Sequence, residues 1–117
     1  MHLYHITPWT DWAAGQAAGA YTAASLQAQG FIHASTREQV LRTAALFYRG
    51  VKGLALLRID AGRLSAPVRW ENTEGGEELF PHLYGALNLD AVDGVADFPP
   101  DPDGTFAFPP DLESNRK

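Results

Sequence analysis

The chain has 117 residues, no cysteine and a formal net charge of −5 at neutral pH. This length fits one domain, and the lack of cysteine excludes a disulfide framework, a thiol nucleophile, a zinc ribbon and an iron–sulfur site. Apolar residues make up 45% and charged residues 20% of the chain, as is typical of a soluble globular protein.

The first thirty residues predict a strand, a helix and a loop. Residues 2–6 are rich in strand-forming side chains. Thr7-Pro8 then matches an N-cap followed by proline at the first position of a helix, which we expect to run to about Ala18. Residues 20–29 are small and polar and predict a loop. The sequence has no basic N-terminal region and no apolar run near the roughly 18 residues of a membrane span, so we expect a cytoplasmic protein without a membrane partner.

A capping box marks the second predicted helix. After a brief strand at 31–34, Ser35 takes the N-cap position and Glu38 follows it three residues later. Apolar residues at helical spacing continue from there to Gly50, which ends the predicted helix.

The rest of the chain predicts mainly strands. The segments with strand-like patterns are 54–60, 68–71, 83–89 and 91–98. The first of them is nearly continuous in apolar residues, which is typical of a central strand. In the second, Trp70 is expected to point inward and Arg69 outward. An acidic loop is predicted at 72–81.

The C-terminal segment holds five of the eight prolines and cannot form a central strand or an uninterrupted helix. We therefore expect a single domain over 1–98 and a proline-rich, partly ordered tail over 99–117. Phe106 and Phe108 are expected to attach the tail to the domain, and the last few residues to be disordered. The predicted fold class is α+β, a small mixed or antiparallel sheet with two main helices.

Histidine is the first candidate for site chemistry. His2 and His5 lie an odd number of positions apart in the first strand and therefore face opposite sides of the sheet. At most one of them belongs to a site, and His5 is the better candidate because it lies further inside the strand. The alternative is that His5 is a structural, hydrogen-bonded residue of the strand.

His33 ends a strand that leads almost directly into the capped helix. The first N–H groups of a helix lack internal partners and attract negative charge. His33, Ser35 and Arg37 could therefore surround a phosphate with an imidazole, a hydroxyl and a guanidinium. The alternative is that Ser35 only caps its helix.

The segment Phe80–Gly85 combines two aromatic residues, proline, histidine and glycine. It predicts either a pocket rim that carries His82 or Tyr84, or a tight turn that holds an aromatic cluster. Three nearby residues are candidate carboxylates: Glu71, Glu77 and Glu78. No glycine-rich phosphate loop, HExxH motif or Gly-x-Ser-x-Gly motif is present. A metal site formed by His33, His82 and a glutamate is chemically allowed, but no short chelate spacing points to one, so we predict no metal.

Charge is distributed unevenly along the chain. Residues 37–70 contain seven basic and two acidic side chains, whereas 71–115 contain eleven acidic side chains and no basic one. The acidic total disfavours a broad nucleic-acid-binding surface. The basic segment is compatible with one phosphate-bearing ligand near its start, or with solvated surface charge.

Several blocks together resemble the bacterial family called Domain of Unknown Function 952, over about residues 1–98. They are Leu3-Tyr4-His5-Ile6, Gly30-Phe31-Ile32-His33-Ala34-Ser35, the strand Leu54–Asp60, Arg69-Trp70-Glu71 and Phe80-Pro81-His82-Leu83-Tyr84-Gly85. The family's name states no activity, so the match by itself implies none.

The order of the first two blocks is also similar to the ADP-ribosyltransferase superfamily. This resemblance implies an ADP-ribosyltransferase-like fold and NAD as cofactor, with His5 holding a ribose and His33 and Ser35 lining the cleft. The third block of that superfamily often carries a glutamate, where this chain has His82, and a neutral imidazole cannot replace the charge.

These features lead to a hypothesis and an alternative. The hypothesis is that the chain binds NAD or another phosphate-bearing nucleotide, with possible ADP-ribosyl or phosphate transfer. In it His5, His33 and His82 are the candidate catalytic residues, and His5, His33, Ser35, Arg37 and Tyr84 the candidate cofactor-binding residues. The alternative is a non-catalytic small-ligand or protein-binding module in which the histidines are structural.

Overall fold

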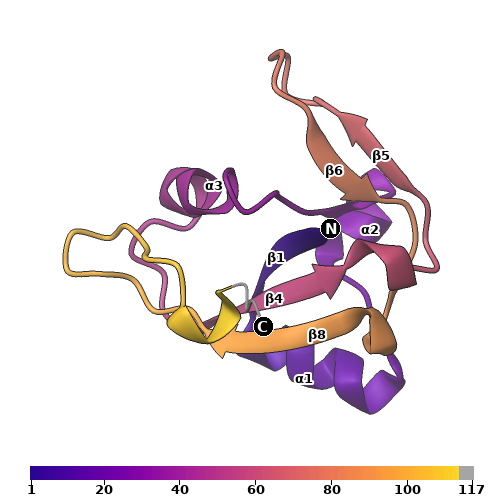
Figure 1. Cartoon of the computed structure of the whole chain (residues 1–117), viewed down its shortest axis with the longest axis horizontal. Helices are drawn as coiled ribbons and strands as arrows, with labels where there is room; N and C mark the ends of the chain where they lie inside the picture. Colours follow the sequence, from indigo (N-terminus) through magenta and orange to yellow (C-terminus); the bar gives the residue numbers. More distant parts are fainter. Residues whose placement is uncertain (114–117) are drawn as a thin grey trace.

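A computed structural model describes residues 1–113 of the chain (Figure 1). Its strands are β1 (His2–Pro8), β2 (Ala20–Tyr21), β3 (Ile32–His33), β4 (Leu54–Asp60), β5 (Val68–Glu71), β6 (Phe80–Leu83), β7 (Leu87–Asn88) and β8 (Val92–Asp97). Its α-helices are α1 (Trp9–Ala18), α2 (Ala24–Gln29) and α3 (Val40–Phe47). The expected disorder of the last few residues concerns 114–117, which lie outside the described residues.

The strands form three small antiparallel sheets. The largest has the order β1-β4-β8, so the predicted central strand 54–60 is confirmed with both of its bounds. A second sheet has the order β3-β6-β5, and β2 pairs with β7. Every strand pair in residues 1–113 is antiparallel, which selects the antiparallel form of the predicted α+β class. β1 lies at the edge of its sheet, and on its outer side Tyr4 forms an isolated β-bridge with Ser35.

Two hydrophobic clusters cover the two faces of the main sheet. Because side chains alternate along β1 and β4, Leu3 and Leu57 pack in the cluster that contains Trp12 of α1, whereas Tyr4 and Leu56 pack in the other cluster. The second cluster joins strand residues with Val40 of α3 and with Phe106 beyond residue 98. Burial on both faces explains why β4 is almost wholly apolar.

The segment after residue 98 is built into this second cluster. Phe106 is buried and stacks on Phe98, with ring centroids 4.7 Å apart, and Leu112 is also buried. Phe108 is half-buried and lies edge-on to Tyr4 at 5.4 Å. The side chains of this proline-rich segment therefore contribute to the same core as the strands.

Several predicted boundaries are wrong. Pro8 is the last residue of β1 and the N-cap of α1, and Thr7 lies fully buried within the strand without capping the helix. The predicted loop at 20–29 contains β2 and α2, and Gly30 ends α2 in the left-handed conformation with φ 91°. The predicted strand 83–89 is interrupted, because β6 ends at Leu83 and β7 begins only at Leu87. Trp70 is 41% exposed rather than inward-facing.

Thr36 and Gln39 form the reciprocal hydrogen bonds of a capping box one residue later than predicted, in the turn that precedes α3, whose N-cap is Gln39. The Thr36 hydroxyl accepts a hydrogen bond from the Gln39 backbone N–H at 3.2 Å, and the Gln39 side-chain oxygen accepts from the Thr36 N–H at 3.0 Å. Ser35 is instead held in a β-bridge with Tyr4, with two backbone hydrogen bonds of 2.8 Å. The bridge keeps Ser35 extended against β1, so the turn that starts the helix begins after it.

Candidate functional site

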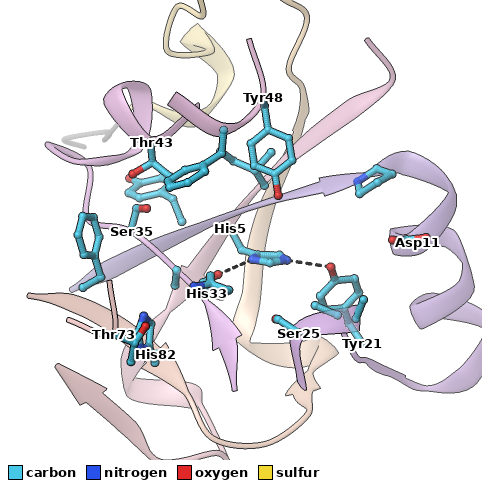
Figure 2. Close-up of a pocket in the computed structure, with 18 of the residues that line it drawn as sticks. His5, Asp11, Tyr21, Ser25, His33, Ser35, Thr43, Tyr48, Thr73 and His82 are labelled. Carbon is cyan, nitrogen blue, oxygen red and sulfur yellow. Dashed lines mark hydrogen bonds between the residues drawn. The ribbon is translucent and has the colours of Figure 1, made fainter. Parts of the chain in front are cut away.

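One cavity of about 470 Å³ lies beside the outer edge of β1 (Figure 2). Its walls come from β1, from the start of α1, from β2 and the start of α2, from β3 and β6, from α3, and from the loop between β5 and β6. The side chains that matter for its chemistry are His5, His33, His82, Ser35, Tyr21, Tyr48, Asp11 and Glu74. The volume lies within the range of small-molecule sites, about 300–1,000 Å³.

His5 is buried in the wall and is held at both ring nitrogens. Its Nδ1 lies 2.5 Å from the carbonyl oxygen of His33, and its Nε2 lies 2.8 Å from the hydroxyl of Tyr21. Figure 2 shows both contacts, with the His5 ring between the other two residues. Burial lowers the pKa of His5 from 6.5 to about 4, although the hydrogen bond to His33 opposes this shift. The imidazole is therefore neutral at neutral pH.

Neutrality determines the direction of these hydrogen bonds. A carbonyl oxygen can only accept, so the single proton of neutral His5 lies on Nδ1 and Nε2 accepts from the Tyr21 hydroxyl. Thr7 Oγ1 lies 2.8 Å from the same hydroxyl oxygen, and because the one Tyr21 proton is used by His5, the Thr7 hydroxyl must be the donor of this bond. Burial raises the pKa of Tyr21 to about 12, which keeps its proton in place. His5 is thus fully hydrogen-bonded by the protein itself.

His82 lies on β6 and lines the cavity, and its ring is hydrogen-bonded to a carboxylate. Its Nδ1 lies 2.9 Å from Glu71 Oε2 on the paired strand β5. The Tyr84 hydroxyl donates a hydrogen bond to the same oxygen. The hydrogen bonds from Tyr84 and His82 lower the pKa of Glu71, so the carboxylate is ionised at neutral pH.

His33 projects from β3 next to His82. Their ring centroids are 5.2 Å apart and nearly perpendicular, and Phe31 stacks on His82 at 4.1 Å with an interplanar angle of 12°. His33 is exposed, and its Nε2 lies 2.8 Å from the Gln29 side-chain oxygen. Burial of part of the ring and the neighbouring His82 lower the pKa of His33. The two imidazoles therefore lie in one aromatic cluster.

The cavity has an aromatic and weakly acidic lining. Among the described residues that line it, Asp11 and Glu74 are the carboxylates and no lysine or arginine is present. The arginines of the basic segment are engaged elsewhere. Arg42 forms an ion pair with Glu78 at 2.5 Å, and Arg58 one with Asp93 at 2.7 Å. The lining therefore disfavours an anionic group inside the cavity.

The structure brings together four of the predicted site residues and separates two. His5, His33, His82 and Ser35 all line the cavity. Arg37 does not, because its guanidinium lies over the Phe108 ring at 3.6 Å and forms an ion pair with Glu113, on another side of β1. Arg37 therefore does not share this cavity with the histidines, and its role at a phosphate stays a prediction.

Tyr84 also lies outside the cavity lining, and its hydroxyl donates a hydrogen bond to Glu71. Of the candidate carboxylates, Glu78 is tied to α3 through Gln39 and Arg42, and Glu71 supports His82. Tyr21 was missed by the sequence reasoning because its segment was predicted as a loop. The one signal for it was a single aromatic residue within a run of small ones.

Two further properties of residues 1–113 bear on function. None of their helices combines the length and the apolar character that crossing a membrane requires. In the same residues, no three acidic or histidine side chains gather in an arrangement that could hold a metal ion.

Fold and site together define a small α+β domain with antiparallel sheets and a cavity at the outer edge of the first strand. The chain belongs to the family described as "Protein of unknown function (DUF952)", whose model matches residues 6–95. This confirms the family that the sequence blocks indicate. No curated protein matches the chain.

Solved structures of protein CC0527 from Caulobacter crescentus are similar to this chain. Its crystal structure has 38% sequence identity and a TM-score of 0.82, covering 92% of this chain and 94% of that one. The solution NMR structure of the same protein has 39% identity and a TM-score of 0.77, covering 89% of this chain and 90% of that one. The fold is therefore shared over nearly the whole length of both proteins.

Proposed function

We propose that the cavity binds the cationic ring and the ribose of a nucleotide such as NAD, with the phosphates outside the cavity. The observation that carries this proposal is the character of the lining: aromatic rings and the carboxylates of Asp11 and Glu74, without a lysine or arginine among the described residues. Aromatic faces and carboxylates attract a cation and repel a phosphate.

The oxidised nicotinamide ring satisfies these conditions because it is a flat pyridinium cation. Tyr21, Tyr48, Phe80 and the imidazoles of the cavity provide ring faces and edges for it. NAD is the ligand that the resemblance to ADP-ribosyltransferases implies, and the lining gives that expectation a physical reason. This reason concerns the nicotinamide ring. The expectation of a phosphate at the start of the helix rested instead on His33, Ser35, Arg37 and the free N–H groups of the helix.

A comparison of charged and neutral forms of the same ring tests the proposal. Binding of 1-methylnicotinamide, which is a pyridinium cation, and of neutral nicotinamide is measured by NMR titration. NAD is compared with NADH in the same way. A cation–π contribution of about 0.5–2 kcal/mol predicts that the cationic form binds roughly 2- to 30-fold more tightly. Equal affinity of the two forms, or no binding of either at millimolar concentration, would refute the proposal.

A matched pair of variants tests whether the preference for the cationic ring arises from the cavity lining. Glu74→Gln removes a carboxylate from the lining and should reduce the preference for the cation. Glu77→Gln makes the same change three residues away, at a carboxylate that does not line the cavity, and should leave the preference unchanged. An equal loss in both variants would attribute the preference to net charge rather than to the cavity.

The second candidate is a non-catalytic small-ligand module with a structural His5. It is favoured by the fact that both nitrogens of His5 are already engaged by His33 and Tyr21. Under this alternative, NAD incubated with the protein is bound but recovered unchanged by mass spectrometry. Release of free nicotinamide, lost in His82→Ala, would rule it out.

A further inference from the structure

We propose that Glu71 and His82 form a proton-accepting dyad whose free nitrogen, His82 Nε2, accepts the proton of a hydroxyl group bound in the cavity. His82 is the residue that contacts the ligand, and Glu71 is a positioning residue that acts through it. The inference deepens the proposed function, on which it rests for the ligand, a ribose hydroxyl.

The first step is the position of the proton on His82. Glu71 Oε2 receives hydrogen bonds from both the Tyr84 hydroxyl and His82 Nδ1, the latter at 2.9 Å. An ionised carboxylate can only accept, so Nδ1 must carry a proton. In a neutral imidazole the other nitrogen, Nε2, then has a free lone pair.

The second step is the access of that lone pair to the cavity. His82 is 3% exposed, and its Nε2 has no hydrogen-bond partner among the described residues. No fully buried side-chain nitrogen or oxygen in residues 1–113 lacks a partner, so Nε2 is not sealed within the protein. Since His82 lines the cavity, we assign the open side of Nε2 to it.

The third step is rigidity. Phe31 stacks on the imidazole at 4.1 Å, and the perpendicular His33 ring lies 5.2 Å away, so packing fixes the ring plane while Glu71 fixes its rotation. His5 provides the contrast within the same cavity. Its Nε2 is occupied by Tyr21, so it has no lone pair to offer.

The chemistry that follows is a single proton transfer. A hydroxyl in contact with Nε2 donates a hydrogen bond to it. When the O–H bond breaks, the proton moves to Nε2 and the electron pair stays on the oxygen. The resulting imidazolium is paired with the Glu71 carboxylate, which stabilises its charge. A carboxylate behind the imidazole thus supplies the negative charge that the imidazole itself lacks.

Long-range ¹H–¹⁵N NMR of the ligand-free protein at about pH 8.5, above the ordinary pKa of histidine, tests the dyad directly. We expect His82 in the Nδ1-protonated tautomer, opposite to the preference of free histidine. Glu71→Leu should shift it to the Nε2-protonated form, and Glu71→Gln, which keeps the size of the side chain, should give a mixture. Glu77→Gln is the matched control and should change nothing. An Nε2-protonated His82 in the native protein overturns the inference whether or not the variants fold.

Titration with two ligands separates the dyad from the proposed function. Nicotinamide riboside and 1-methylnicotinamide carry the same cationic ring, but only the riboside has hydroxyl groups. We expect both to bind, and only the riboside to shift the His82 Nε2 resonance. If both bind and neither shifts it, the dyad does not accept a hydroxyl and the inference is wrong. If neither binds, the proposed function is wrong, and with it the ribose as ligand.

Discussion

Replacement of His5 by a residue that does not titrate should flatten the dependence of stability on pH. The pKa of His5 is about 4 in the folded protein, against 6.5 for an ordinary histidine. Between these values the unfolded chain binds a proton that the folded chain does not, so acidification favours unfolding. From these two values, protonation of His5 should cost about 2 kcal/mol of folding free energy between about pH 6.5 and pH 4.5.

Urea denaturation of the native protein and of His5→Gln at intervals across this range measures the effect. Both lose some stability on acidification, because the pKa of His33 is also lowered by burial. The difference between the two curves isolates His5. Glutamine leaves the His33 carbonyl without its partner and should cost about 1–3 kcal/mol at neutral pH. The two stabilities should then converge as the pH falls.

Tyr21→Phe is the control for this prediction. It removes one hydrogen bond of His5 but leaves the imidazole buried, and burial is the largest cause of the lowered pKa. The variant should be less stable by about 1 kcal/mol at each pH while keeping the native slope. Parallel pH curves for the native protein and His5→Gln would refute the reasoning, because they would mean that His5 titrates alike in the folded and unfolded chains.

Three further substitutions test the local structure by urea denaturation. Thr36→Ala removes the capping hydroxyl and should lower the free energy of unfolding by about 1 kcal/mol. Ser35→Ala should cost less, and the reverse order would contradict the observed capping box. Gly15→Ala should destabilise the protein by about 1–3 kcal/mol, because the added Cβ would lie 2.9 Å from Tyr21 Cα. An unchanged midpoint for Gly15→Ala would show that α1 and β2 can separate without cost.

The sequence predicts best where a segment's own pattern determines its structure. Strand 54–60 is predicted with both of its bounds because it is nearly continuous in apolar residues, a pattern typical of a strand covered on both faces. The capping box shows the limit. Ser35–Glu38 and Thr36–Gln39 both match the motif, and the β-bridge between Ser35 and Tyr4 decides between them. That bridge joins residues thirty-one positions apart and leaves no local signal.

The residues of the candidate site can also be divided into those that a local sequence block indicates and those whose contacts depend on distant segments. His5, His33 and His82 were singled out by their blocks, and the structure places them on one cavity. The arginine nearest to them in sequence, Arg37, turns to Phe108 in the C-terminal segment, which no local pattern could reveal. The pairing of Glu71 with His82 depends on the register of β5 against β6, in which they lie on neighbouring strands eleven positions apart.

The strand order of the main sheet has a consequence for how the chain folds during synthesis. β1 is made first, but its partner β4 is complete only at Asp60, and β8 closes the sheet at Asp97. The second cluster also waits for Phe106 and Leu112. Such distant pairings delay folding of the domain until the segment up to Leu112 is available. Until then the apolar faces of β1 and β4 lack the side chains that cover them in the folded domain, and uncovered apolar surface of this kind favours aggregation.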